Sequence, residues 1–332
     1  MRNPQNRQIS IRAAAVATIA AAALALTACT AASAGVDGDG YPSGPITIVV
    51  GYAAGGSGDP IAREYAAHLK EILGTSVVVE NLPGGSGTIG ITKVVNAKPD
   101  GYTLGFATNS SLSLQVLSNP DLSFQTTDAY TTIGGLGSQP AVIGVRADAP
   151  WETFEDLIDD MRKNPGEITI AVGGAGNVKD LQLQEFARTA GVEFVIAPFS
   201  GGGAEAVTAV LGGRTDAIAV NGSTLAGLVE SGDIRGIVAF TPGKFSMFPA
   251  ETFADNPWGT RFVSDSFGMI APAGLPENVQ TRLEEAHAEI MADPEFIAFI
   301  EEEGAELFIG TGADFAAQLT EDKEVFQEML ND

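Results

Sequence analysis

The chain is poor in the residue types that most enzyme active sites use. Its 332 residues include one cysteine and two histidines, and 18 lysines and arginines stand against 42 acidic residues. With Cys29 as its one cysteine, the chain has neither an internal disulfide nor a thiolate cluster for a metal. His68 and His287 both fall within helical periodicity, where a packed or solvated helix position explains them. We therefore expect no metal and no cofactor, and any hydrolytic chemistry would have to use carboxylates alone.

The formal net charge of −24 limits the possible partners. Such an excess of negative charge repels phosphate backbones and anionic lipid headgroups. We therefore do not expect a nucleic acid as a partner. The charge suits a strongly hydrated surface, and we expect a monomer.

The N-terminus has the layout of a secretory leader. Arg2, Arg7 and Arg12 precede an alanine-rich apolar run, which small residues follow up to Cys29. The run is shorter than the roughly 20 residues that a membrane span needs, so we predict an export signal over residues 1–28. A protein with this leader works outside the cytoplasmic membrane.

The position of the cysteine indicates how the mature protein is held. The sequence Leu-Thr-Ala-Cys at residues 26–29 resembles a bacterial lipobox, in which the cysteine receives lipid and becomes the mature N-terminus. We expect Cys29 to anchor the protein to the outer face of the cell membrane, or in a periplasm, by acyl chains. The alternative is a plain signal peptide with an incidental cysteine. Residues 29–44 are small, polar and turn-prone, which predicts a flexible tether.

From Ile46 onward, short β-branched runs alternate with helical patterns. This alternation is typical of βαβ units and a mainly parallel sheet, so the predicted class is α/β. The predicted strands are 46–52, 76–80, 102–108, 130–135, 141–146, 168–172, 194–197, 216–220, 234–240 and 266–271. The predicted helices are 60–73, 88–96, 110–117, 153–163, 178–190, 203–211, 223–230, 276–292, 294–303 and 313–330.

These elements divide into two α/β series followed by a short C-terminal piece. The last piece is too short to fold alone and most simply packs back onto the first series. We therefore expect lobe I to comprise residues 45–146 and 265–332, and lobe II residues 147–264. Two chain crossings, near 144–149 and 262–267, would form a hinge between them.

Four glycine-rich turns share one pattern, in which a strand leads through the turn into the start of a helix. Amides at a helix N-terminus carry partial positive charge, and absent side chains let an anion approach the backbone. Two such loops on each lobe, at the carboxyl ends of strands, would bind a carboxylate or phosphate with no cationic side chain. The alternative is that the glycines only make tight turns. The loops are residues 52–59, 84–90, 173–177 and 199–203.

Known enzyme motifs fit these loops poorly. Residues 85–90 satisfy GxGxxG, but four residues separate them from their strand and the next strand ends without an acid for a ribose. No Gly-Lys-Ser/Thr of a phosphate loop follows any of the loops, and none contains GxSxG. Asp59 and Asp216 are the remaining candidates for an exported hydrolase, although helix capping or structural hydrogen bonding explains each of them better.

The loops also carry a family resemblance. The ordered series of motifs resembles the tripartite tricarboxylate transporter substrate-binding receptors, the TctC or Bug family, over nearly all of the mature chain. The motifs are Pro-Ile-Thr-Ile-Val-Val at 45–50, Gly-Gly-Ser-Gly-Asp at 55–59, Val-Glu-Asn-Leu-Pro-Gly at 79–84, Gly-Thr-Ile-Gly at 87–90, Pro-Asp-Gly-Tyr-Thr-Leu at 99–104, 198–201, 266–274 and Asp-Pro at 293–294.

The resemblance implies a two-lobed fold of the periplasmic-binding-protein type (type II) with a hinge, no enzymatic activity, and a small di- or tricarboxylate as ligand. It also implies integral-membrane permease subunits as partners. A receptor that senses ligand for a membrane signalling partner is the alternative. The ligand-binding roles carry over to Tyr52, Ala53, Gly55, Gly56, Ser57, Asp59, Thr88, Thr108 and Asn109 in the first lobe, and to Ala175, Gly176, Asn177, Phe199, Ser200 and Gly201 in the second.

The chain departs from the family pattern at several of these positions. Ala54 replaces the usual proline before the first Gly-Gly, and Gly58 replaces a hydroxyl residue before Asp59. In the second-lobe loop, Asn177 and Asp180 stand where the family has a hydroxyl residue and a histidine. Ser266 replaces an aromatic residue. These changes affect the contacts to the distal part of the ligand, so the resemblance does not identify the solute.

Overall fold

The computed structural model describes residues 40–332. The predicted signal peptide, the lipidation at Cys29 and most of the tether lie outside the described residues. Residues 42–332 form one compact unit. Within the described part of the chain, no helix is both long and apolar enough to cross a membrane.

The first sheet has the order β2-β1-β3-β11-β4-β12. β1 pairs in parallel with β2 and β3, whereas β11 is antiparallel to both β3 and β4. Ile46, Ile48 and Val50 are completely buried, as expected for a central strand covered on both faces. The strands are β1 (Ile46–Val50), β2 (Val77–Asn81), β3 (Thr103–Thr108), β4 (Tyr130–Gln139), β11 (Asp265–Pro272) and β12 (Glu306–Leu307).

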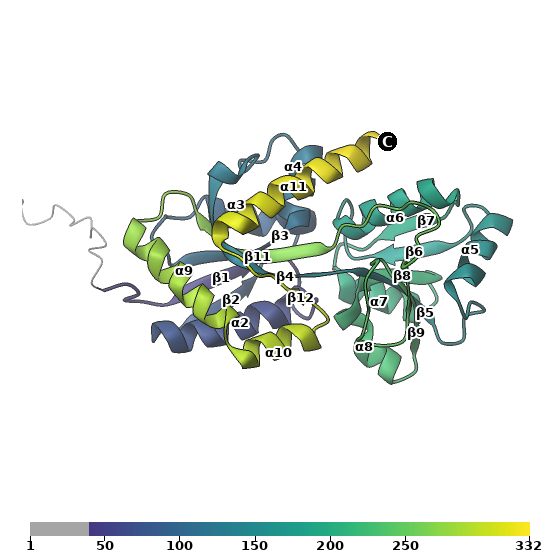
Figure 1. The fold of residues 1–332 in the computed structure, drawn as a ribbon, viewed down its shortest axis with the longest axis horizontal. Coiled ribbons are helices and arrows are strands. Elements are labelled where there is room, and N and C mark those ends of the chain that lie inside the picture. The colour runs from purple at the N-terminus through teal and green to yellow at the C-terminus, as the bar shows by residue number, and fades with distance from the viewer. Residues whose placement is uncertain (1–39) are drawn as a thin grey trace, which may run out of the picture. The chain divides into compact units, whose positions relative to one another are not determined.

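Helices cover both faces of this sheet (Figure 1). The α2, α9 and α10 helices lie together on one face, and α3 and α11 lie on the other. Tyr65, Leu69 and Ile61 form the buried stripe of α2, at the spacing that an amphipathic helix requires. The helices are α2 (Gly58–Leu73), α3 (Thr88–Val95), α9 (Glu277–Met291), α10 (Pro294–Glu302) and α11 (Gly312–Asn331). Residues 110–118 contain a π-helical turn (Ser110–Leu114) and the short α4 (Gln115–Ser118).

The second sheet repeats the same arrangement, with the order β7-β6-β8-β5-β9-β10. Its core contains a cluster of aromatic rings from Phe154, Phe186, Phe240, Phe253 and Trp258. The strands are β5 (Ala141–Arg146), β6 (Thr169–Val172), β7 (Val195–Pro198), β8 (Ala217–Asn221), β9 (Ile234–Ala239) and β10 (Glu251–Thr252), and the helices are α5 (Phe154–Lys163), α6 (Val178–Ala190), α7 (Gly203–Leu211) and α8 (Gly222–Glu230).

Two details of the sheets differ from the sequence prediction. Both sheets are mixed, because β11 and β12 in the first sheet and β5 in the second run antiparallel to the strands beside them. In addition, β5 belongs to the second sheet, where it pairs with β8 and β9, so residues 141–146 were wrongly assigned to lobe I. The chain leaves the first sheet at Pro140, where the missing N–H ends the strand hydrogen bonding.

The two strands that connect the sheets are hydrogen-bonded neighbours at the crossing. Asp265, the first residue of β11, lies opposite Gln139, the last residue of β4. Pro140 and Ser264 are therefore the points at which the chain passes between the lobes. Ser264 lies within the predicted range 262–267, whereas Pro140 lies before the predicted range 144–149.

A buried histidine generates a prediction for the fold. His287 on α9 is 3% exposed and its Nδ1 lies 3.2 Å from the Tyr65 hydroxyl. Burial lowers the pKa of His287 from 6.5 to about 4, against an opposing contribution from the backbone of Gly135. Below pH 6.5 the unfolded chain gains a proton that the folded chain does not. The free energy of unfolding should therefore fall by about 3 kcal/mol from this group between pH 6.5 and 4.

The test compares the wild type with His287→Gln, which keeps a polar group but does not titrate. Urea unfolding at several pH values should give a difference in free energy of unfolding that shrinks as the pH falls through this window. A difference that is the same at every pH would contradict the assignment.

Candidate functional site

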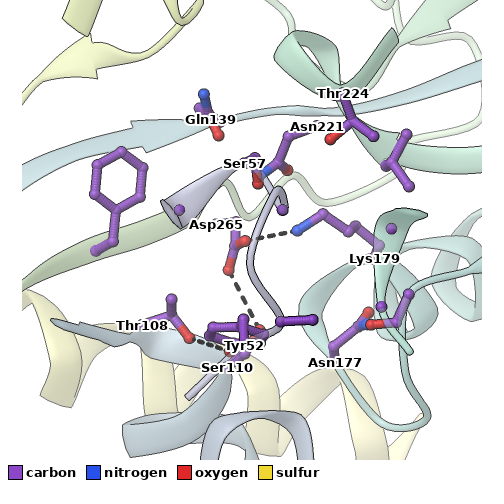
Figure 2. A pocket seen from close by; sticks show the side chains of 18 of the residues that line it. Tyr52, Ser57, Thr108, Ser110, Gln139, Asn177, Lys179, Asn221, Thr224 and Asp265 are labelled. Carbon is purple, nitrogen blue, oxygen red and sulfur yellow. Dashed lines mark hydrogen bonds and ion pairs between the residues drawn. The ribbon is translucent and has the colours of Figure 1, made fainter. Parts of the chain in front are cut away.

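A pocket that is partly open to solvent lies between loops of the two lobes (Figure 2). The loops at the carboxyl ends of β1, β6 and β8 line it, with the start of α7 and the two crossing strands. Parallel strands end at the same edge of a sheet, so loops that are distant in sequence converge there. The lining residues are Tyr52, Ala53, Gly56, Ser57, Gly58, Phe106, Thr108, Ser110, Gln139, Gly173, Asn177, Lys179, Gly201, Gly202, Gly203, Ala204, Val220, Asn221, Thr224, Asp265 and Phe267.

The first lobe contributes the start of α2. Ser57 is the N-cap and Gly58 the first helical residue, and within residues 40–332 their amides have no hydrogen-bond acceptor. A β-carbon at Gly58 would lie 2.8 Å from the ring of Phe106. The absence of a side chain at Gly58 thus lets the loop lie directly on Phe106. Two unsatisfied donors at a helix N-terminus favour a negatively charged group.

The second lobe contributes the start of α7 in the same way. Gly202 is the N-cap, and the following amides of Gly203 and Ala204 have no acceptor in the part of the chain that the structure describes. A β-carbon at Gly173 would lie 2.7 Å from the Gly203 nitrogen. Glycine at 173 therefore lets the loop after β6 contact the backbone of α7. Both lobes present helix N-termini to one pocket.

Tyr52 connects the loop after β1 with the rest of the first lobe. Its hydroxyl donates to the Ser86 carbonyl at 3.1 Å and lies 2.8 Å from the Thr108 hydroxyl. Burial, and next the negative charge of Asp265, raise the pKa of Tyr52 well above its ordinary value. The phenol is therefore a neutral hydrogen-bonding group at any physiological pH.

The pocket also contains one cation. Lys179 on α6 and Asp265 at the start of β11 form an ion pair at 2.6 Å, and both side chains are about seven-eighths buried, at 12% and 13% exposure. Ser110 donates to the other carboxylate oxygen of Asp265 and accepts from the Val178 amide. Figure 2 shows this pair in the middle of the site. The expectation of a site with no cationic side chain was wrong, because Lys179 lines the pocket beside the helix N-termini.

Seven residues expected to bind ligand line this pocket. They are Tyr52, Ala53, Gly56, Ser57, Thr108, Asn177 and Gly201. Two more, Ala175 and Ser200, line an adjacent cavity that shares Tyr52 and Gly173 with the first one. The other six, which are Gly55, Asp59, Thr88, Asn109, Gly176 and Phe199, line neither cavity.

Asp59 shows why some of these residues lie outside the pocket. Its carboxylate accepts hydrogen bonds from the Gly55 amide, from Arg63 and from Asn81. Burial acts to raise the pKa of Asp59, but the bonds from Arg63, Asn81 and Gly55 outweigh it and hold the pKa below its ordinary value. Asp59 thus fixes the loop that carries Ser57 instead of facing the pocket.

The remaining residues are likewise engaged elsewhere. Asn109 donates to Asp322 and to the Ser264 carbonyl, beside the crossing. The Thr88 hydroxyl donates to the Gly85 carbonyl, and the Gly176 amide donates to Asp180. Phe199 lies under the guanidinium of Arg214, at 5.3 Å. These contacts engage groups that were expected to meet a ligand, although the Oδ1 of Asn109 is buried without a partner among the described residues.

The glycines at 84–90 serve packing and turn geometry. Gly84, Gly85 and Gly87 have positive φ angles, which residues with a side chain rarely adopt. A β-carbon at Gly51 would lie 2.6 Å from the backbone of Gly87. For this loop the structure therefore favours the turn explanation for glycine, although the loop lines the adjacent cavity.

The sequence analysis missed most of the polar side chains of the pocket. Lys179 could have been recognised from the sequence, because a cation in the first turn of a helix is unfavourable with the helix dipole. Gln139 and Asp265 flank the chain crossings, and Asn221 ends β8. Gly58, Gly173, Gly202 and Gly203 belong to the predicted glycine loops but were not named as ligand-binding residues. The other lining residues that were not predicted are Phe106, Ser110, Ala204, Val220, Thr224 and Phe267.

The carboxylates considered for a hydrolase do not line the pocket. Asp216 accepts from the amide and the hydroxyl of Thr169 at 2.8 and 2.7 Å, and Asp59 is engaged as described. Among residues 40–332, no group of three or more metal-binding side chains is assembled. The arrangement of helix amides and one lysine is suited to holding an anion.

The role of Asp59 can be tested through stability. Asp59→Ala leaves the Gly55 amide, Arg63 and Asn81 without their acceptor, so the free energy of unfolding should fall by about 1–3 kcal/mol. Asp128→Ala, at an exposed position, should change it by less than about 0.5 kcal/mol. Urea unfolding at neutral pH measures both. Equal values for the two variants would contradict a structural role for Asp59.

Comparisons with known proteins agree with this geometry. Residues 61–330 match the model of the family described as the tripartite tricarboxylate transporter family receptor, TctC. A relative from Agrobacterium vitis, the UPF0065 protein in the TAR-I ttuE-ttuC′ intergenic region, is 30% identical over 262 residues, which cover 77% of this chain and 74% of the relative.

Solved structures show the same fold. The periplasmic binding protein BugD superposes with a TM-score of 0.79 at 27% identity, covering 88% of this chain and 98% of BugD. The R. palustris protein Rpa4515 with adipate superposes with a TM-score of 0.82 at 25% identity, covering 88% of this chain and 97% of that protein. The predicted α/β fold of the periplasmic-binding-protein type is confirmed. The chain belongs to the TctC family of solute-binding receptors.

Proposed function

We propose that this receptor captures a small carboxylate of the di- or tricarboxylate type between its lobes and delivers it to a tripartite tricarboxylate-type permease. The observation that carries the ligand class is the convergence of Lys179 with free helix amides of both lobes in one pocket. Such donors bind an anion with charge-assisted hydrogen bonds. The adipate in the R. palustris structure supports the same class.

Contacts between the lobes support capture by closure. Asn221 of the second lobe donates to the Ser57 hydroxyl at 2.8 Å, and the Ser86 hydroxyl of the first lobe donates to the Ala175 carbonyl at 2.7 Å. Gln115 donates to the Gly176 carbonyl. In each contact one partner, Ser57, Ala175 or Gly176, is a predicted ligand-binding residue. A ligand that contacts both lobes would shift the population toward the closed form.

The proposed ligand-binding site consists of residues that line the pocket, including some that the sequence did not indicate. From the first lobe it takes Tyr52, Ser57 and Thr108, and from the second Asn177, Lys179 and the amides of Gly203 and Ala204. Asp59 supports the loop from behind.

The most direct test is a calorimetric titration of the mature protein with citrate, tricarballylate, succinate, adipate and amino diacids. Binding of at least one of them is expected, and its absence for all of them at low and moderate salt would contradict the proposal. Lys179→Gln should weaken binding at least about tenfold, because it removes a charged donor and leaves Asp265 to repel the ligand.

The matched control is Lys163→Gln, which makes the same charge change on the same lobe at a side chain that is 73% exposed. Its affinity should stay within about twofold of the wild type. An unchanged affinity in Lys179→Gln would remove Lys179 from the site.

The proposed location is the outer face of the cell membrane or a periplasm, with lipid on Cys29. Cys29→Ser should release the protein from the membrane fraction, because serine at this position does not receive the acyl chains. A signal peptide that is cleaved without lipidation leaves no anchor. Immunoblots of membrane and soluble fractions would measure this. Equal distribution of the wild type and the variant would favour the plain signal peptide.

A further inference from the structure

One side of the pocket presents hydrogen-bond acceptors. Figure 2 shows Gln139, Asn221 and Thr224 along one side of the site, with Tyr52, Thr108 and Ser110 along the other. Gln139 is 1% exposed and Asn221 4% exposed, and both line the pocket. Deeply buried amide side chains are normally hydrogen-bonded at both their nitrogen and their oxygen. Their partners therefore indicate what else belongs in the site.

The orientation of Gln139 is fixed by the protein. Its Nε2 donates to the Glu303 carbonyl at 2.5 Å. A carbonyl only accepts, so the nitrogen of Gln139 must face Glu303 and the oxygen must face the other way. Within the described residues, no donor reaches this oxygen. In Figure 2 the oxygen end of Gln139 points down toward Ser57.

Asn221 provides a second acceptor. Its Nδ2 donates to the Ser57 hydroxyl, while its Oδ1 is buried without a hydrogen-bond partner among residues 40–332. A buried carbonyl without a donor is less stable than one with a hydrogen-bond partner. The amide oxygens of Gln139 and Asn221 thus both lack a donor among the described residues.

The charges of the pocket point in the same direction. Lys179 and Asp265 are the charged side chains among the described lining residues, and they pair with each other. A ligand carboxylate that approaches Lys179 comes close to Asp265 as well. A donor group next to the carboxylate of the same ligand would contact Asp265 and the amide oxygens of Gln139 and Asn221. The carboxylate would at the same time contact Lys179.

From this geometry we infer that Gln139 and Asn221 select a carboxylate that also carries a hydrogen-bond donor, an amino or a hydroxyl group, next to a carboxyl group. The inference rests on the proposed function and narrows its ligand class. A plain diacid such as succinate or adipate would leave both amide oxygens without a partner. Sites built to hydrogen-bond a ligand group discriminate strongly against the analogue that lacks it.

The test uses ligand series that differ at one carbon. Succinate, malate and aspartate share a four-carbon skeleton and carry hydrogen, hydroxyl or ammonium at C2, and glutarate, 2-hydroxyglutarate and glutamate form the five-carbon series. Calorimetry on the wild-type mature protein should show malate or aspartate, or the five-carbon equivalent, binding at least about tenfold tighter than the plain diacid. The better of the two identifies the donor.

A substitution at Gln139 tests whether this side chain causes the preference for the donor-bearing ligand. Gln139→Met removes the acceptor at similar volume, so the preference for the donor-bearing ligand over the plain diacid should fall to within about threefold. Gln327→Met, at an exposed position of α11, should keep the full preference. Asn221→Leu provides a second variant with the same expected loss, and thermal unfolding of each variant shows that it is folded.

The outcomes separate the two proposals. Plain diacids that bind as tightly as, or tighter than, their amino and hydroxy analogues would overturn the inference and leave the carboxylate receptor in place. A preference that persists undiminished in both Gln139→Met and Asn221→Leu would also overturn it. Failure of every carboxylate to bind would overturn the proposed function, and the inference with it.

Discussion

The antiparallel pairing of β4 with β11 at the chain crossing is the constraint on which the site depends. Asp265 lies opposite Gln139 where both strands leave the first sheet. This pairing brings a carboxylate and an amide from residues 126 positions apart into one pocket. The carboxylate then meets Lys179 of the second lobe, and the amide nitrogen is held by the Glu303 carbonyl. Polar groups that the loops alone could not position are thus supplied by regular structure.

The pocket resolves an electrostatic difficulty that the composition creates. A protein with a net charge of −24 repels anions at long range. Salt at physiological concentration screens this repulsion at separations beyond about 8–10 Å. Short-range donors are screened much less when they are buried. Free amides at the starts of α2 and α7 and the buried ammonium of Lys179 provide such donors. Binding of an anion therefore depends on the local arrangement of donors and is compatible with an acidic surface.

The sequence predicted the secondary structure well and the polar part of the site poorly. Helices 178–190 and 203–211 were predicted with the bounds that the structure has, because apolar periodicity and glycine at the ends are local signals. The membership of β5 in the second sheet is not local, since a strand of that composition could pair in either sheet. Lys179, Gln139 and Asp265 are brought together by tertiary pairing, which leaves no motif. Asp59 makes structural hydrogen bonds with its neighbours Gly55 and Arg63, as its sequence context indicated, and it does not line the pocket, although the resemblance implied a ligand-binding role.

The positions of the contacts between the lobes bear on how the receptor would open. A rotation about the crossings at Pro140 and Ser264 moves atoms in proportion to their distance from those points. Asp265 is adjacent to a crossing, so its pairing with Lys179 would be disturbed least. The Ser57–Asn221 and Ser86–Ala175 contacts are each a single neutral hydrogen bond, worth about 1 kcal/mol. Such contacts are weak enough to break without ligand, whereas a ligand held at once by the α2 and α7 amides adds charge-assisted bonds to both lobes. The closed form would then be stable chiefly when the pocket is filled, as a receptor that must release its solute requires.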